Sequence, residues 1–207
     1  MDQKTSTSQP SPADDKQRRS GRWKLFAVIA VCAAPIIASY LTYYVIKPQS
    51  RNNYGELLDP RNYPVPELSS TALDGKPLTL DAYQGKWLML QVDGGACQKA
   101  CQDKLFEMRQ LRLMQGKEME RIERVWLITD DQPLPTMVMR EYDGTRLLRV
   151  KPDLLKAWLP TEAGTSAADH IYLMDPRGHL MMRFPKDADP SKVKKDLSKL
   201  LRASAIG

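Results

Sequence analysis

Cysteine and histidine are scarce in this chain. Its 207 residues include three cysteines and two histidines. Three cysteines are too few for a scaffold held together by disulfides, which excludes the small disulfide-rich folds. Hydrophobic residues make up 42% of the chain and charged residues 27%. This composition suits one ordinary globular domain with extra segments and leaves no room for two large cores.

The chain also lacks a strongly basic domain, although its net charge is +6. Residues 1–24 contain six Lys or Arg and three Asp, which leaves 25 basic and 22 acidic residues in the remainder. Half of the excess therefore lies in a cluster beside an apolar run, and the rest of the chain is nearly balanced. This distribution argues against a role in nucleic-acid binding.

One long hydrophobic run is present, at residues 25–46, and its 22 residues include no charge. As a helix it reaches about 33 Å at about 1.5 Å per residue, enough to cross a membrane. Basic residues precede it, Trp23 lies at one expected interface and Tyr40, Tyr43 and Tyr44 lie at the other. We predict a single-pass helix in a bacterial inner membrane, with the N-terminus cytoplasmic and the following domain periplasmic. A cleaved signal peptide is the alternative, although its apolar core is usually shorter.

The segments on either side of this run are poor in apolar residues. Residues 1–24 are rich in polar residues and predict a disordered tail. Residues 47–64 contain several Pro and Asn and predict a linker. The folded domain is then expected over residues 65–203, beginning with a hairpin that turns at Asp74-Gly75.

Two apolar runs predict the centre of the domain. Residues 87–92 are apolar almost throughout, as expected for a strand covered on both faces, and residues 124–129 predict a second buried strand. Between them, from about Cys101, apolar residues recur at helical spacing. Strand, helix and strand in this order predict a parallel pair joined by a crossover helix. Met108 and Met114 lie on the apolar face of that helix, which favours core packing over copper binding.

The second half predicts helices at 136–142 and 153–159, a short strand at 147–150, a strand hairpin over 170–184 and a last helix from Asp189-Pro190. The order from residue 86 is thioredoxin-like. We therefore predict an α/β fold, with a central mixed sheet flanked by helices, an added N-terminal hairpin and one transmembrane helix.

The stretch from Asp93 to Cys101 joins the first strand to the first helix and carries the candidate chemistry. Gly94 and Gly95 allow a tight turn. Cys97 and Cys101 stand four apart, so on a helix they would share one face. A helix N-terminus favours the thiolate, which is the form that attacks disulfides and binds soft metals. The two cysteines are thus candidates for a redox pair.

The three residues between these cysteines, where the common redox motif has two, leave space for an ion between the sulfurs. His170, at the head of the predicted hairpin, is the natural third ligand, because strand starts in this fold can lie close to the first helix. Two thiolates and an imidazole suit Cu(I) or Cu(II) better than a hard cation. The alternative is an ordinary, partly buried histidine. His179 adjoins a Pro-Gly turn and is expected to be a surface residue.

Several short motifs together resemble the Sco/SenC family. They are Gly85-Lys86-Trp87 before a buried strand, the Cys97-x-x-x-Cys101 pair, the strand end 128–131, and Asp169-His170 followed by residues 172–178. The resemblance covers about residues 65–203 and the single anchor. Departures are Gln98 where the family commonly has proline, Ile171 where a small hydroxylated residue is usual, and the Asp93-Gly94-Gly95 approach to the cysteines.

The resemblance implies a membrane-anchored, thioredoxin-like protein that assists cytochrome c oxidase assembly. In that family the two cysteines and the histidine bind copper, which implies the ligand set Cys97, Cys101 and His170. The implied function is to deliver copper to the dinuclear copper centre of oxidase subunit II, or to reduce the cysteines of that subunit. Other copper chaperones or thiol reductants of the periplasm are implied as further partners.

Three functions remain open at this point. The first is copper delivery, and the second is thiol-disulfide exchange without a metal, in which Cys97 would be essential and His170 dispensable. The third is a structural assembly subunit that uses the fold only as a docking surface. A peroxidase of similar fold is disfavoured, because no proline and threonine flank Cys97.

Overall fold

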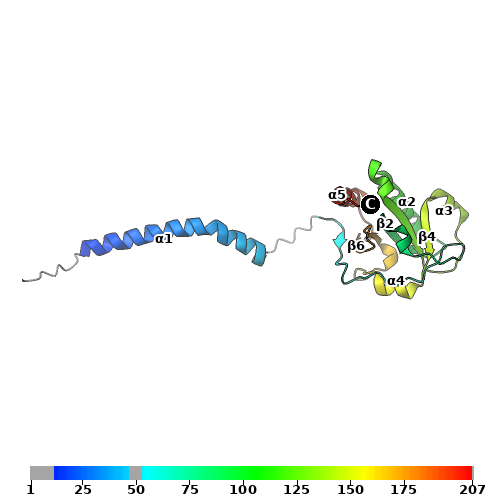
Figure 1. The fold of residues 1–207 in the computed structure, drawn as a ribbon, viewed down its shortest axis with the longest axis horizontal. Coiled ribbons are helices and arrows are strands. Elements are labelled where there is room, and N and C mark those ends of the chain that lie inside the picture. The colour runs from blue at the N-terminus through cyan, green and yellow to red at the C-terminus, as the bar shows by residue number, and fades with distance from the viewer. Residues whose placement is uncertain (1–11, 47–52, 207) are drawn as a thin grey trace, which may run out of the picture. The chain divides into compact units, whose positions relative to one another are not determined.

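The chain divides into two compact units in the computed structural model, which describes residues 12–46 and 53–206. The first unit holds α1 (Pro12–Leu41) and a π-helical turn, η1 (Thr42–Ile46). The second unit, from Asn52 onward, holds the remaining elements. Figure 1 shows the ribbon of both units.

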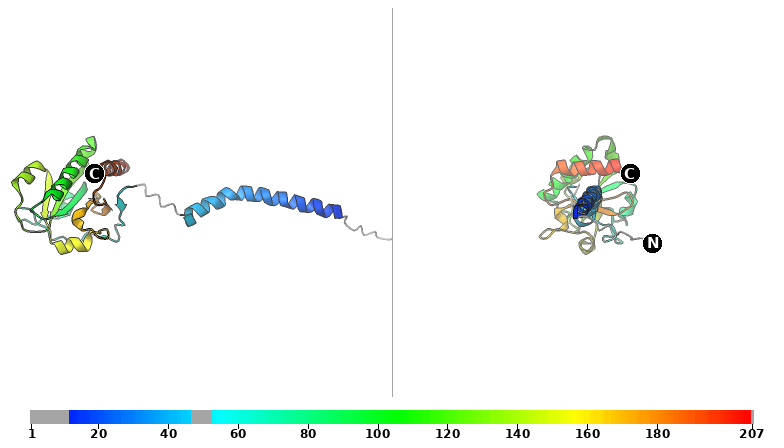
Figure 2. Two further views of the ribbon diagram at one scale, coloured as in Figure 1. Left: turned by 180° about the vertical axis from the view of Figure 1, so that it is seen from behind. Right: turned by 90° about the vertical axis from the view of Figure 1, so that its left-hand side faces the viewer.

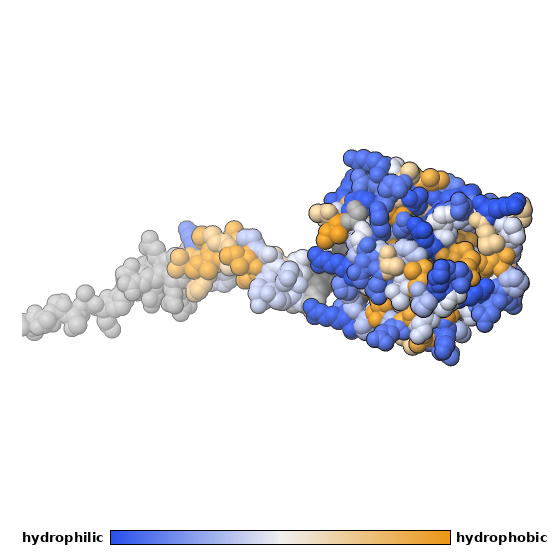
Figure 3. All heavy atoms as spheres, turned by 45° about the vertical axis from the view of Figure 1, so that its right-hand side comes forward, coloured by the Kyte–Doolittle hydropathy of each residue, from blue (hydrophilic) through white to orange (hydrophobic). Residues whose placement is uncertain are grey.

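The N-terminal helix extends further toward the N-terminus than the sequence predicts. Residues 12–24 are helical and not disordered, whereas the predicted tail over residues 1–11 lies outside the described residues. Within the described residues, Trp23–Tyr44 is the only helix long and apolar enough to cross a membrane, with a mean hydropathy of 2.2. Its apolar side chains are exposed (Figure 3). In a membrane, lipid chains would cover these apolar side chains.

The second unit is built on a six-stranded mixed sheet in the order β1-β6-β5-β2-β3-β4. β2 pairs in parallel with β3 and β3 with β4, while β2–β5, β5–β6 and β6–β1 are antiparallel. The parallel β2–β3 pair with a crossover helix confirms the prediction. The strands are β1 (Glu56–Leu57), β2 (Trp87–Asp93), β3 (Ile122–Ile128), β4 (Thr145–Arg149), β5 (Ile171–Met174) and β6 (Leu180–Arg183).

Helices cover both faces of this sheet. Figures 1 and 2 show α2 and α5 over one face and α4 over the other. The helices are α2 (Lys99–Leu113), α3 (Thr136–Glu141), α4 (Pro152–Trp158) and α5 (Pro190–Ala203), with shorter turns η2 (Leu80–Tyr83), η3 (Gly116–Arg121) and η4 (Ala167–Asp169). The sheet is therefore a middle layer between helices, as predicted, and its central strands are buried on both sides.

Alternation along the strands divides the core between these two faces. Met89 of β2 packs in the cluster that contains Met108 of α2 and Val193 of α5. Leu90 of β2 packs in the opposite cluster with Trp158 of α4. Every residue of β2 from Trp87 to Val92 is buried, which confirms the prediction of a strand covered on both faces. Met114 is an exception to the predicted apolar stripe of α2, since it follows the helix and is exposed.

The domain begins earlier than residue 65. β1, at Glu56–Leu57, pairs with β6, and Leu58 is buried against the core. The backbone N–H groups of Tyr54 and Gly55 donate to Asp196 Oδ2 at 2.6 and 2.9 Å. Residues 53–64 are thus part of the folded unit and not a linker, because they add a strand and satisfy a buried carboxylate. The first part of the predicted linker, residues 47–52, lies outside the described residues.

The expected hairpin around Asp74-Gly75 is short and irregular, and its arms are not regular strands. Gly75 has a φ of +78°, and Ala72 donates its N–H to the Lys76 carbonyl oxygen at 2.9 Å. An antiparallel bridge between Thr71 and Pro77 joins its two arms, and the Leu78 N–H donates to the Ser70 carbonyl oxygen at 3.0 Å. The turn lies beside β4, since Thr71 also bridges Arg149.

Candidate functional site

The two cysteines lie where β2 passes into α2. β2 ends at Asp93, the chain turns at Gly94 and Gly95, and α2 begins at Lys99. Cys97 precedes the helix with a φ of +38°, whereas Cys101 lies in its first turn. The prediction that both cysteines share one helical face is therefore wrong, because Cys97 has a left-handed backbone conformation and lies before the first residue of the helix.

Cys97 and Cys101 form a disulfide, with their Cα atoms 5.1 Å apart. Both residues are almost inaccessible, with 2% and 1% of their surface exposed. They pack in a small apolar cluster that includes Leu105 of α2 and Trp126 of β3. A partner molecule can reach either sulfur only if the loop before α2 moves.

A second loop holds the cysteine loop in place. The Gly95 N–H donates to Asp130 Oδ1 at 2.8 Å, and Gln132 donates its N–H to the same oxygen at 3.2 Å. A Cβ atom at Gly95 would lie 2.5 Å from the Gln132 carbonyl oxygen, and one at Gly94 would lie 2.6 Å from Asp130 Oδ2. The two glycines are thus required by the close approach of the loop that follows β3.

Gln91 contacts Cys101 through its side-chain amide. Sequence reasoning alone does not single it out as a site residue. It lies in β2 with none of its surface exposed. Its Nε2 donates to the Cys101 carbonyl oxygen at 3.1 Å and lies 3.2 Å from Cys101 Sγ. The signal in the sequence is a single polar residue within the apolar run 87–92.

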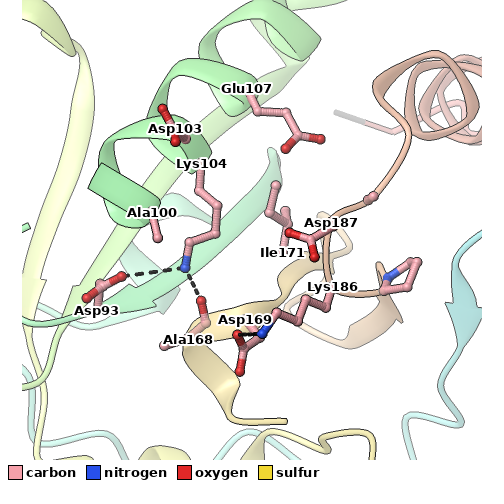
Figure 4. Close-up of a pocket in the computed structure, with 12 residues that line it drawn as sticks. Asp93, Ala100, Asp103, Lys104, Glu107, Ala168, Asp169, Ile171, Lys186 and Asp187 are labelled. Carbon is pink, nitrogen blue, oxygen red and sulfur yellow. Dashed lines mark hydrogen bonds and ion pairs between the residues drawn. The ribbon is translucent and has the colours of Figure 1, made fainter. Parts of the chain in front are cut away.

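A cleft of about 380 Å³ lies beside the cysteine loop (Figure 4). Lys104 of α2 projects into it, with its Nζ 3.5 Å from Asp93 Oδ2 and hydrogen bonded to the Ala168 carbonyl oxygen. Burial lowers the pKa of Lys104, and the carboxylate of Asp93 opposes that effect. This lysine therefore ties the end of β2 to the segment that precedes β5.

Several carboxylates also line the cleft, among them Asp169 and Glu107. Asp169 accepts a hydrogen bond from the Ser166 N–H at 2.8 Å and lies 3.1 Å from Lys186, and these contacts lower its pKa to about 2. Glu107 points into the cleft from α2 toward the segment of Asp187 (Figure 4). One carboxylate oxygen of Glu107 is buried without a hydrogen-bond partner among the described residues, and burial raises its pKa.

His170 is fully buried, and both of its ring nitrogens have protein partners. Nδ1 lies 2.9 Å from the Phe184 carbonyl oxygen, and Nε2 lies 2.7 Å from the Thr165 hydroxyl. Its backbone is nonetheless close to the cysteine site, because the next residue, Ile171, is paired with Gln91 across β5 and β2. The start of β5 thus lies where the sequence suggested, but the imidazole is engaged elsewhere.

The proposed copper ligands do not form a metal site in this conformation. Both sulfurs are used in the disulfide, so neither is a thiolate, and both imidazole nitrogens are hydrogen bonded. Across residues 12–46 and 53–206, no three His, Cys, Asp or Glu side chains are grouped so that they could hold a metal ion. Cys32 is exposed on α1. His179 is on the surface beside Asp175, as expected.

Two family models match the chain. One, described as the transmembrane-like, thioredoxin-like, C-terminal domain, matches residues 87–204. The other, described as the transmembrane-like, N-terminal domain, matches residues 14–45. Together they match the apolar helix and strands β2 to β6 with the cysteine loop. Comparison with curated protein sequences gives no match.

Solved structures of similar fold include Sco proteins. BsSco, described as a member of the Sco family of cytochrome c oxidase assembly proteins, has a TM-score of 0.50 and 16% identity, and the match covers 70% of this chain and 98% of BsSco. A putative electron transfer protein from Aquifex aeolicus has a TM-score of 0.51 and 12% identity, over 69% and 99% of the two chains. Copper-bound ScoI of Arabidopsis thaliana has a TM-score of 0.48 and 19% identity, over 73% and 99%. The family model confirms the thioredoxin-like fold, and the match to BsSco confirms the predicted resemblance of that fold to Sco proteins.

Proposed function

The chain belongs to the family of transmembrane-like proteins with a thioredoxin-like C-terminal domain, and we propose that it is a membrane-anchored thiol-disulfide exchange protein. The observation that carries this proposal is the disulfide between Cys97 and Cys101 where β2 enters α2. The first turn of a helix stabilises a leaving thiolate through its unpaired N–H groups. A disulfide in this position therefore releases a stabilised thiolate when another thiolate attacks it.

The exchange needs only the two cysteines and a substrate dithiol. A substrate thiolate attacks Cys97 Sγ, the bond between the two sulfurs breaks, and Cys101 leaves as a thiolate. The second substrate thiolate then attacks the substrate sulfur of the mixed disulfide, and Cys97 leaves. Two electrons pass from the substrate dithiol to the cysteine pair, and the substrate becomes a disulfide. The same steps in reverse reduce a substrate disulfide.

We assign the attacked sulfur to Cys97 because of its position. Cys97 lies in the loop before α2, where the chain can move without unwinding the helix. Cys101 is held in the helix and contacts Gln91. The burial of both sulfurs means that exchange requires the loop to open, so the substrate must stabilise an open form.

Copper delivery is the second candidate function, and one observation favours it. The pairing of Ile171 with Gln91 places the backbone of His170 next to the strand whose Gln91 contacts Cys101. Copper would be the cargo of Cys97, Cys101 and His170. Binding would first require reduction of the disulfide and release of His170 from Thr165 and Phe184. We rank this candidate second because both changes are needed before the ligand set exists.

We extend the proposal to location and partner. The basic residues that precede the apolar helix favour an N-terminus in the cytoplasm and a domain on the other side of the membrane. We place the helix in a bacterial inner membrane, so the domain would lie in the periplasm. The resemblance of the motifs to Sco/SenC proteins supports a role in cytochrome c oxidase assembly. The substrate would then be the pair of copper-binding cysteines in oxidase subunit II, offered either for thiol exchange or for copper transfer.

The exchange function is tested with the oxidised full chain in detergent and a peptide that carries two thiols. Mass spectrometry after alkylation follows formation of the peptide disulfide and of the Cys97 and Cys101 thiols. Parent protein and the Cys32→Ser control should react equally, while Cys97→Ser and Cys101→Ser should not complete the exchange. Loss of reaction in Cys32→Ser, or its persistence when both site cysteines are replaced, would contradict the proposal.

The copper candidate is tested by competition between the reduced full chain and a chromophoric Cu(I) chelator. His170→Ala should weaken binding at least tenfold if His170 is a ligand, whereas His179→Ala, a matched change at the surface histidine, should have no effect. Equal affinities of the parent and both variants would remove His170 from the ligand set.

A further inference from the structure

Gln91 is a polar residue in the buried centre of β2, and its amide is directed to one partner residue. The Nε2 atom lies 3.1 Å from the Cys101 carbonyl oxygen and 3.2 Å from Cys101 Sγ. A carboxamide nitrogen carries two protons. One can bond to the carbonyl oxygen while the other faces the sulfur. The amide thus binds the backbone and the side chain of the same cysteine.

The contacts fix the orientation of this amide. A flipped amide would place its oxygen against the Cys101 carbonyl oxygen, and two acceptors would then face each other. In the observed orientation Gln91 Oε1 is buried and has no hydrogen-bond partner among the described residues. Burial of an unpaired amide oxygen is costly, so simple packing would favour an apolar residue here. A function of the N–H groups at Cys101 would explain why a glutamine occupies the position.

We propose that Gln91 is a positioning residue that stabilises the reduced form of Cys101 and makes the Cys97–Cys101 pair a stronger oxidant. The inference rests on the proposed exchange function and adds to it the preferred direction of electron transfer, from the substrate to the cysteine pair. A disulfide sulfur is a weak hydrogen-bond acceptor, whereas the thiolate that leaves when the disulfide opens carries a full negative charge. The N–H bond from Gln91 becomes charge-assisted when Cys101 is reduced, and it is therefore stronger in that state.

The surroundings of Cys101 increase this difference. Its neighbours in the small cluster are mainly apolar and include Leu105, Trp126 and Val138. A hydrogen bond has more effect in such surroundings than in water, because no solvent competes for the sulfur. An interaction that is stronger in the reduced state raises the reduction potential of the pair. The preferred substrate class is accordingly a protein dithiol that becomes oxidised.

The test is the reduction potential of the pair, measured on the full chain in detergent against mixtures of reduced and oxidised dithiothreitol. A Cys32→Ser background leaves Cys97 and Cys101 as the only thiols. Gln91→Met keeps a similar volume and removes the N–H donors. We expect the disulfide to be favoured about tenfold more in Gln91→Met, which corresponds to a potential lower by about 30 mV.

Met89→Leu is the matched control, since Met89 is buried on the same face of β2 but packs in the neighbouring cluster with Met108. Its potential should equal that of the parent. If Gln91→Met does not fold, Gln91→Asn should give a downward shift, because its amide is one methylene too short to reach the sulfur. An equilibrium constant in the folded Gln91 variant within twofold of the parent value, or an equal shift in Met89→Leu, would overturn the inference. A parent disulfide that dithiothreitol cannot open would contradict the exchange function itself.

Discussion

The Nε2 atom of His170 lies 2.7 Å from the hydroxyl oxygen of Thr165, and this contact decides how the histidine should behave. With Nδ1 directed to the Phe184 carbonyl oxygen, the ring connects the segment before β5 to the end of β6. In this conformation the histidine has a structural role. It does not take part in the exchange steps that we assign to the cysteines.

We therefore predict that His170→Ala lowers the free energy of unfolding and leaves the exchange chemistry intact. The substitution leaves a buried carbonyl oxygen without its partner and opens a cavity, which should cost about 2–4 kcal/mol. Urea unfolding of the disulfide-bonded protein measures this loss. His179→Ala, at an exposed position, should change stability by less than about 0.5 kcal/mol. If His170→Ala were as stable as the parent but unable to exchange thiols, the histidine would belong to the reaction instead.

The second prediction concerns Gly95, whose Cβ position is occupied by the Gln132 carbonyl oxygen at 2.5 Å. Gly95→Ala should destabilise the domain by about 1–3 kcal/mol, as overpacking usually does. It should also change the exchange rate, because the cysteine loop must shift away from Asp130. Gly75→Ala is the control, since that turn has open space around it and its only penalty is the positive φ. Thermal unfolding and exchange kinetics should separate the two variants, and identical behaviour would contradict the proposed close fit of the loop.

The third prediction concerns Glu107, whose pKa is raised by burial. A carboxyl group with a raised pKa in the folded state binds its proton more tightly there than in the unfolded chain. Its ionisation therefore reduces stability as pH rises above the unfolded value, and the penalty is absent at lower pH. Glu107→Gln should raise the melting temperature at pH 7, and the gain should disappear toward pH 4.

Glu67→Gln provides the comparison for this prediction, since Glu67 is exposed. It should give nearly the same melting temperature as the parent at both pH values. A gain from Glu107→Gln that stayed constant from pH 7 to pH 4 would show that ionisation of Glu107 is not its cause.

The fourth prediction concerns the orientation of the membrane anchor. A unique cysteine placed at position 4, after replacement of the three native cysteines, should be labelled by an impermeant thiol reagent only after the inner membrane is opened. A unique cysteine at position 203, after replacement of the three native cysteines, should be labelled once the outer membrane is permeabilised. The reverse pattern would contradict a cytoplasmic N-terminus.

The central strands were predictable because their sequence signal is strong. Trp87 to Val92 are almost all apolar, and a run of this kind has few alternatives to a buried strand. β1 was not predictable in the same way, because its two residues, Glu56 and Leu57, show no periodicity. Their strand conformation depends on pairing with Met182 and Arg183, which are more than 100 residues away in the chain. Tertiary contacts of this kind leave no local trace.

The sequence singles out the two cysteines of the candidate site but not their geometry. The motif and the strand order placed Cys97, Cys101 and the start of β5 in one region. The orientation of the His170 ring is set by its hydrogen-bond contacts with Thr165 and Phe184, and no motif specifies these contacts. The positive φ of Cys97 likewise has no signal in its own residue type, because residues other than glycine rarely adopt it. Gln91 carried a visible signal, a polar residue in an apolar strand, although its contact with Cys101 required the structure.

The most direct test of the central claim is to trap the mixed disulfide on the full-length chain. A variant with Cys101→Ser and Cys32→Ser retains only Cys97, so a substrate joined to that sulfur cannot be released by its neighbour. After incubation with a dithiol peptide previously oxidised to its disulfide, mass spectrometry should show the peptide bound to Cys97. The matched variant with Cys97→Ser and Cys32→Ser should give little adduct. No adduct on Cys97, or equal adducts on both cysteines, would contradict the assignment of Cys97 as the exchanging sulfur.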